Sequence, residues 1–273
     1  MIQVIATTPY TDQKMGTAGL RKKSKVVMQE HYFENFLQSI FNTIDPAGKT
    51  FVVGGDGRFY NSIAIQKLIK MAAANGVKKL IVGQNGFLST PASSNMILKR
   101  RTDGGFVLSA SHNPGGENGD FGIKFATETG GQCSSLVSDR IFAVSQTISE
   151  FKTVDAADID LSRLGMQNLE GMEIEIVDPI SDYVELMEKI FDFELIKKMF
   201  ADGFTMRFDA MNCPSGCVKY HTVGCRIIGS HRYFIGTVFY DLVCLVFKFH
   251  TLTILILFHK KAVQINSAPL PHA

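Results

Sequence analysis

Residues 50–76, TFVVGGDGRFYNSIAIQKLIKMAAANG, form one complete strand–turn–helix unit and decide the fold class. Residues 51–53 are a short apolar run of the kind found in buried strands. Residues 54–58 are rich in turn formers, apolar side chains then recur at helical spacing over 65–73, and Gly76 is a helix stop. This order predicts a buried parallel strand followed by a helix that covers the sheet.

The same alternation recurs along the chain. The apolar run at 80–82 leads into the turn-rich GQNG at 83–86, and a helix is expected to begin near Pro91. The run at 106–108 leads into the loop 109–116, SASHNPGG. The pattern predicts a three-layer α/β/α domain with a mixed, mostly parallel sheet. Because ligands bind beyond the carboxyl ends of such strands, the loop 109–116 is the expected place for chemistry.

Later segments extend this organisation. Helical spacing is expected over 139–151 and 181–200, a polar connection over 155–173, a strand over 174–177 and the opening strand of a second similar domain over 206–211. The predicted domains are 1–180 for the first α/β domain, 181–212 for the start of the second, and 213–273 for an irregular, poorly ordered apolar tail.

The composition is that of a globular chain. Its 273 residues are 45% hydrophobic and 20% charged, enough for one full domain and part of another. The net charge of +2 indicates neither nucleic acid nor an anionic membrane as a partner. The first residues lack the features of a secretory signal, so a cytoplasmic protein is expected. Five dispersed cysteines favour reduced thiols over a disulfide framework.

The apolar run at 233–258 allows two interpretations. It has about the length that a transmembrane helix needs, roughly 20 residues. However, Asp241, Lys248 and His250 interrupt it, and charges are costly near the centre of a bilayer. A tail that does not fold cleanly is therefore favoured over a membrane span.

A zinc site is a second possibility for this region. The candidate ligands are Cys213, Cys217, His221, Cys225 and His231. Structural zinc sites have regularly spaced close pairs of ligands, whereas this set has one Cys-x-x-x-Cys pair and scattered histidines. The spacing therefore disfavours zinc.

The strongest chemical signal is ASHNPGG at 110–116 together with GDFGIKF at 119–125. A serine hydroxyl is a weak nucleophile at neutral pH and needs a base or positive partners to exchange a phosphoryl group. His112 and Lys124 are candidates for both. Glycines let the backbone approach a phosphate closely, and exposed N–H groups can bind its oxygens. A bare Ser-His pair, by contrast, is more often incidental in a surface loop.

The complete string resembles the active-site serine segment of the α-D-phosphohexomutases, and its two glycines after Pro114 resemble the phosphoglucomutase branch. GTAGLRK at 16–22 is similar to the family's Gly-Thr-Ser-Gly-Leu-Arg motif, with Ala18 in place of serine. The resemblance covers about residues 7–211. Further matches in order and approximate spacing are GGDGRF at 54–59, GQNG at 83–86 and STPA at 89–92.

The resemblance implies roles for particular residues. Ser111 would carry the phosphoryl group, and Arg21 and Lys124 would offset its charge of about −1.5 to −2. Lys124 would also transfer protons, with His112 beside it. Arg58 is expected to be structural, because a buried arginine would tie the Asp56 loop together. The implied catalytic residues are Ser111, His112, Lys124 and Arg21, and the phosphate- and substrate-binding residues are Thr17, Gly19, Arg21, Ser111, His112, Asn113 and Lys124.

The resemblance also implies an activity. Family members interconvert glucose 1-phosphate and glucose 6-phosphate through a phosphoserine and a bisphosphate intermediate. A hexose phosphate would be the substrate, glucose 1,6-bisphosphate the activator and intermediate, and Mg²⁺ would bind the phosphate of Ser111 and an aspartate-rich loop. The protein would act as a monomer.

Several family features are absent from this sequence. There is no Asp-Gly-Asp-Gly-Asp loop, and DAADID at 155–160 lacks its glycine spacing. Family members build their cleft from four domains, and a mutase must hold both ends of its substrate. The chain is therefore expected to be truncated and inactive alone. The alternative is a non-catalytic binding or structural protein derived from a mutase domain.

Overall fold

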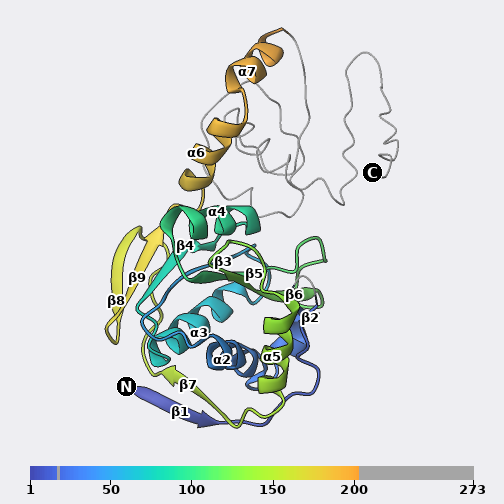
Figure 1. Ribbon diagram of the computed structural model, residues 1–273, viewed down its shortest axis with the longest axis vertical. Helices are drawn as coiled ribbons and strands as arrows, with labels where there is room; N and C mark the ends of the chain where they lie inside the picture. The colour runs from blue at the N-terminus through green and yellow to red at the C-terminus, as the bar shows by residue number, and fades with distance from the viewer. Residues whose placement is uncertain (17–18, 203–273) are drawn as a thin grey trace. The chain divides into compact units, whose positions relative to one another are not determined.

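The computed structural model describes residues 1–16 and 19–202 (Figure 1). The chain divides into a compact unit, Met1–Leu186, and a second unit that begins at Met187. The strands are β1 (Ile2–Ala6), β2 (Leu20–Lys23), β3 (Thr50–Gly55), β4 (Lys79–Phe87), β5 (Gly104–Leu108), β6 (Asp120–Thr127), β7 (Glu150–Val154), β8 (Gly165–Leu169) and β9 (Met172–Val177). The helices are α1 (Ser24–Val27), α2 (Tyr32–Ile44), α3 (Asn61–Ala74), α4 (Thr90–Arg100), α5 (Ser135–Ser145), α6 (Ser181–Ile190) and α7 (Phe193–Ala201).

A seven-stranded sheet in the order β2-β6-β5-β3-β4-β9-β8 forms the centre of the first unit. Strands β5, β3, β4 and β9 are parallel to one another. Strand β6 pairs antiparallel with β5 and β2, and β8 pairs antiparallel with β9. The sheet is thus mixed and mostly parallel, which confirms the predicted fold class.

Helices cover both faces of this sheet (Figure 1). Helix α4 lies on one face, and α2, α3 and α5 lie on the other. The core between the sheet and α2 and α3 is rich in aromatic rings, with Phe33, Phe36, Phe41, Phe51 and Phe106 all essentially inaccessible to solvent. Burial of each such side chain contributes roughly 1.5–3 kcal/mol, so this layer supplies much of the stability that holds the strand ends in place.

A second, two-stranded sheet was not expected from the sequence. Strand β1 pairs antiparallel with β7, and Figure 1 shows this ribbon beyond α2 and α3, on the side away from the main sheet. The helix predicted over 139–151 is wrong in its second half, because α5 ends at Ser145 and Phe151 lies in β7. Phe151 is buried beneath the ribbon, so tertiary packing rather than local spacing decides its conformation.

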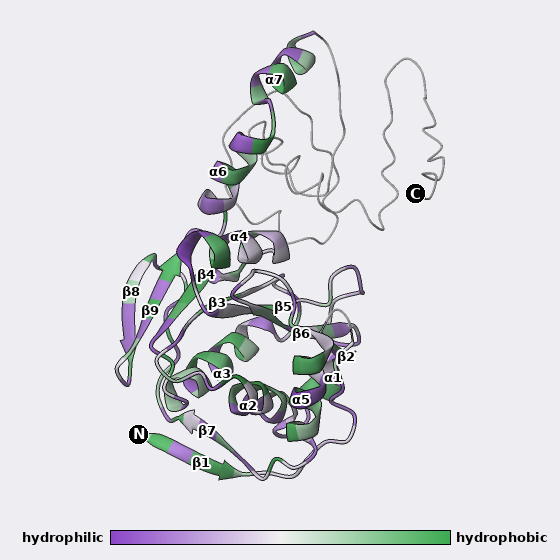
Figure 2. Ribbon diagram, in the orientation of Figure 1, coloured by the Kyte–Doolittle hydropathy of each residue, from purple (hydrophilic) through white to green (hydrophobic). Residues whose placement is uncertain are grey.

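The predicted polar connection at 155–173 is also corrected. It contains β8, an edge strand with mostly exposed residues, and β9 begins at Met172. Figure 2 shows hydrophobic and hydrophilic residues alternating along β9, as expected for a strand with one buried face. An edge strand that faces water needs no apolar alternation, which explains why β8 escapes detection from the sequence.

Two further boundaries differ from the sequence prediction. The turn predicted at 83–86 lies inside β4, where Asn85 and Gly86 have positive φ values of 55° and 75°. The single helix predicted over 181–200 is two helices, because the Asp192 side chain caps the N-terminus of α7 by accepting a hydrogen bond from the N–H of Leu195.

The strand predicted at 206–211, the apolar tail at 213–273 and the candidate zinc ligands lie outside the described residues. The predicted domain boundaries at 180 and 212 stay predictions. Within the described part of the chain, no helix has the length and apolar character needed to cross a membrane.

Candidate active site

Ser111 lies in the loop after β5, at the carboxyl end of a parallel strand. Its φ of +57° is uncommon for a residue with a side chain, and such a conformation costs on the order of 1 kcal/mol or more unless its surroundings hold it. The Ser111 side chain is exposed, while its N–H donates a hydrogen bond to the Ser109 hydroxyl at 3.0 Å. The backbone is therefore anchored and the hydroxyl is presented to solvent.

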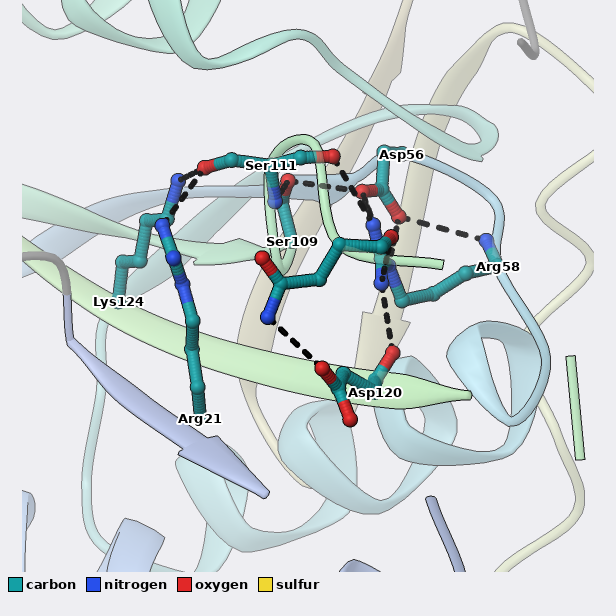
Figure 3. Close-up of polar contacts among 8 residues, drawn as sticks. Arg21, Asp56, Arg58, Ser109, Ser111, Asp120 and Lys124 are labelled. Atoms are coloured by element: carbon teal, nitrogen blue, oxygen red, sulfur yellow. Dashed lines mark hydrogen bonds and ion pairs between the residues drawn. The ribbon is translucent and has the colours of Figure 1, made fainter. Parts of the chain in front are cut away.

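Two cations meet at the Ser111 hydroxyl. Arg21 Nη2 donates to Ser111 Oγ at 3.1 Å, and Lys124 Nζ donates to the same oxygen at 2.9 Å. Figure 3 shows both side chains converging on this atom. They come from β2 and β6, which pair antiparallel with Arg21 opposite Gly122. Sheet pairing thus gathers three residues that are far apart in the sequence.

Lys124 is buried, with 5% of its surface exposed. Burial lowers the pKa of its ammonium group, and the neighbouring Arg21 charge lowers it further. A lowered pKa increases the neutral fraction of a lysine, and the neutral amine can accept a proton. The site therefore holds a permanent cation, Arg21, beside a group that can change its protonation state.

Gly19 makes the close packing of β2 on Lys124 possible. Its φ is +88°, and a Cβ atom here would lie 2.4 Å from the carbonyl oxygen of Ile123 and 2.9 Å from Cγ of Lys124. Gly19 thus acts by its small size. The predicted binding residue Thr17 lies outside the described residues.

Arg58 ties the serine loop to the end of β3. Its guanidinium donates to both carboxylate oxygens of Asp56, at 2.8 Å from Nε and 2.6 Å from Nη2. It also donates to the backbone carbonyls of Asp120 at 2.6 Å and Ser111 at 3.3 Å (Figure 3). The Arg58 side chain is only 7% exposed. A planar group with five donors suits this position, as predicted for a structural arginine.

Ser109 links that ion pair to Ser111, and sequence reasoning missed it. Its hydroxyl donates to Asp56 Oδ2 at 2.8 Å and accepts the hydrogen bond from Ser111 N–H. The chain of contacts from Arg58 through Asp56 and Ser109 thus ends on the backbone of Ser111. A polar residue directly after a buried apolar strand was the available signal.

Asn113 and His112 do not contact the Ser111 hydroxyl. Asn113 donates to Asp120 Oδ2 at 2.7 Å, and Lys23 pairs with Asp120 Oδ1 at 2.8 Å. The hydrogen bond from Lys23 lowers the pKa of the Asp120 carboxyl, and the one from Asn113 lowers it further. The His112 imidazole is exposed and makes no hydrogen bond or ion pair within residues 1–16 and 19–202. Asn113 therefore shapes the loop, whereas His112 remains available to a ligand.

Residues 12–152 match the family model described as phosphoglucomutase/phosphomannomutase, alpha/beta/alpha domain I. The chain belongs to this family. It is 52% identical over 217 residues to the phosphoglucomutase of Rhizobium radiobacter, covering 79% of this chain and 40% of the relative. It is 48% identical over 219 residues to a chloroplastic phosphoglucomutase of Brassica napus, covering 79% of this chain and 35% of that one.

A solved structure gives the same result. The crystal structure of the exocytosis-sensitive phosphoprotein pp63/parafusin, a phosphoglucomutase from Paramecium in its open form, matches with a TM-score of 0.75 and 43% identity. The match covers 79% of this chain and 42% of that one. The resemblance inferred from the sequence motifs is confirmed. The chain spans less than half the length of these relatives.

The described residues do not form a metal site in this family member. No group of three or more His, Cys, Asp or Glu side chains is placed to hold an ion in the part of the chain that the structure describes. Two carboxylates beside the Ser111 loop are already engaged, Asp56 by Arg58 and Asp120 by Lys23 and Asn113.

A cavity of about 300 Å³ reaches Lys124 from the side of Gly16 and Gly19. The remaining lining is mixed in polarity and consists of Met15, Phe125, Gln132, Cys133, Ser135, Ser138 and Asp139. Burial raises the pKa of the Cys133 thiol, which is therefore kept in its neutral, unreactive form.

Proposed function

We propose that this chain provides the phosphoserine site of a phosphoglucomutase-type mutase, which interconverts glucose 1-phosphate and glucose 6-phosphate through a bisphosphate intermediate. The observation that carries the proposal is the meeting of Arg21 and Lys124 at one exposed serine oxygen. Two cations beside a hydroxyl suit an oxygen that alternates between free and phosphorylated states, because phosphoryl transfer depends mainly on charge stabilisation and positioning.

The residues have complementary tasks in the transfer. When the bisphosphate gives up a phosphoryl group, its oxygen–phosphorus bond breaks and a bond from Ser111 Oγ to phosphorus forms. Burial lowers the pKa of Lys124, and in its neutral form this residue takes the serine proton and passes it to the sugar oxygen that is released. Transfer to the other end of the sugar reverses these steps.

Arg21 is proposed to bind the phosphoryl oxygens. Its Nη2 already contacts Ser111 Oγ, and its Nε is buried without a hydrogen-bond partner in the described part of the chain. A buried N–H without a partner is costly, on the order of 1–3 kcal/mol. A phosphate oxygen next to Ser111 would satisfy it. The proposed substrate contacts of Thr17, His112 and Asn113 have no such support among the described contacts.

Mg²⁺ and glucose 1,6-bisphosphate are part of the proposal as cofactor and intermediate. The described residues hold no cluster of three or more metal-binding side chains, so the phosphate on Ser111 is the one ligand that we assign to Mg²⁺. Groups that recognise the sugar and its distal phosphate would have to come from outside the described residues. This chain alone is expected to exchange phosphate at Ser111 without completing the isomerisation. A cytosolic, monomeric protein is proposed with it.

Labelled glucose 1,6-bisphosphate tests the proposal directly. The purified chain is incubated with the ³²P-labelled compound, and the label is located by phosphopeptide mapping. Label on Ser111 that is lost in Ser111→Ala and retained in Ser138→Ala, a change in α5, is the expected result. A wild-type chain that takes up no label would refute transfer by these residues and would favour a non-catalytic binding or structural role.

A further inference from the structure

Both halves of the serine loop are held by one short segment, Arg21 to Ser24. Arg21 reaches Ser111 at the start of the loop. At the other end, the Ser24 hydroxyl donates to the carbonyl oxygens of Gly116 at 3.0 Å and Gly119 at 3.3 Å. The Ser24 N–H donates to Gly119 as well, at 2.9 Å. Ser24 thus extends the pairing of β2 with β6 past Asp120 and into the loop.

We propose that Ser24 is a positioning residue for the phosphoryl transfer at Ser111. Its hydroxyl binds the half of the loop from Pro114 to Gly119 to the segment that carries Arg21. The Arg21 guanidinium and the loop therefore keep a fixed position relative to each other. The inference rests on the proposed function and adds a residue that sequence motifs do not indicate.

The outer half of the loop has few other attachments. Residues 115–118 are exposed and contribute no apolar side chain to the core. The ion pair between Lys25 and Glu117 is 3.8 Å long with both side chains more than half exposed, and such pairs contribute little. The remaining contacts, Gly119 N–H to Gly116 and Asp120 N–H to Pro114, lie within the turn itself. Ser24 is therefore the buried side chain that connects this turn to the rest of the described structure.

Two features show that the contact is built into the fold. Ser24 is completely buried at the first position of α1. Its hydroxyl donates hydrogen bonds to the loop and does not cap α1. The turn that it holds is tightly wound, because a Cβ atom on Gly119 would lie 2.3 Å from the carbonyl oxygen of Gly115. A small displacement of this turn would be passed along the chain to His112 and Ser111, and misplacement by about 1 Å can cost two orders of magnitude in rate.

Ser24→Ala tests the inference, and Ser39→Ala is the matched control. Ser39 is equally buried and donates its hydroxyl to the carbonyl of Asn35 within α2, away from the loop. Hydrogen–deuterium exchange at Gly119 and Asp120 is expected to be about fivefold faster in Ser24→Ala, which corresponds to the loss of one neutral hydrogen bond. Ser39→Ala should leave these amides unchanged. Equal exchange in wild type and Ser24→Ala would overturn the proposal.

Ser24→Cys separates hydrogen bonding from packing. Cysteine fills nearly the same volume but is a weak donor, so it should loosen the loop as alanine does. A cysteine variant with wild-type exchange would show that volume matters rather than the hydroxyl, and would refute the proposal.

The functional readout is the labelling of Ser111 by ³²P-glucose 1,6-bisphosphate. The rate at saturating bisphosphate is expected to fall about tenfold in Ser24→Ala, with the half-saturating concentration unchanged, because the loop is misplaced but the cations remain. An unchanged rate with faster exchange would leave Ser24 a purely structural residue. If the wild-type chain takes up no label, the proposed function fails, while the exchange experiment still decides whether Ser24 holds the loop.

Discussion

Replacing Arg58 by lysine is expected to destabilise the protein by about 2.5–6 kcal/mol, although the charge is kept. The guanidinium donates to both oxygens of the Asp56 carboxylate and, at 3.3 Å or less, to the carbonyls of Asp120 and Ser111. An ammonium group on a flexible stem can keep one contact with Asp56. Loss of one charged hydrogen bond, about 1.5–3 kcal/mol, and two to neutral carbonyls, about 0.5–1.5 kcal/mol each, gives this estimate.

Urea unfolding followed by far-ultraviolet circular dichroism measures the effect, since the chain has no tryptophan. Arg140→Lys is the control, because Arg140 is exposed on α5 and should change stability by less than about 0.5 kcal/mol. Asp56→Asn completes a double-mutant cycle, in which a coupling energy of at least about 1.5 kcal/mol is expected. If Arg58→Lys costs no more than the control, or the cycle shows no coupling, the structural role assigned to Arg58 is wrong.

Three further predictions concern other parts of the first unit. Gly19→Ala should cost at least about 2 kcal/mol more in urea unfolding than Gly171→Ala, because both have φ near +90° but only Gly19 has neighbours within 4 Å of the added Cβ. Lys124→Met should be more stable than wild type at pH 7, with a gain that shrinks toward pH 10. Folding lowers the pKa of Lys124, so at pH values between the folded and unfolded pKa the unfolded chain binds more protons than the folded chain. Wild-type stability therefore rises with pH in this range. A constant difference in unfolding free energy between the two proteins from pH 7 to 10 would contradict this. Asp182→Asn should lower the free energy of unfolding by about 1–2 kcal/mol at neutral pH, because Asp182 forms ion pairs with two cations of α4. Burial alone would raise the pKa of this carboxyl, but the two ion pairs lower it. That stability is present above the unfolded pKa of about 4 and is lost as the pH falls further, so the two proteins should converge in acid unfolding.

Local patterns were sufficient for the central parallel strands of the main sheet. The apolar runs at 51–53, 80–82 and 106–108 predict β3, β4 and β5, because strands that are buried on both faces are continuously apolar. Gly76 correctly predicts the end of a helix. Strands β1, β2, β7 and β8 were not predicted. Each lies in a small ribbon or at a sheet edge, where partner strands and packing, rather than the residues' own periodicity, decide the conformation.

The same division holds for the candidate site. The amino-acid sequence by itself determined that Ser111 lies in a glycine-rich loop after a buried strand. It also determined that the chain belongs to the phosphohexomutases, because both features follow from contiguous sequence motifs. The family resemblance implied that Arg21 and Lys124 lie near Ser111, but only the tertiary structure decided that both donate to its Oγ. Tertiary structure also decided that Ser109 and Ser24 hold the loop and that Asn113 faces Asp120 instead of the hydroxyl. The physical reason is that hydrogen bonds of 2.9–3.3 Å between distant segments depend on strand register, which local sequence does not specify.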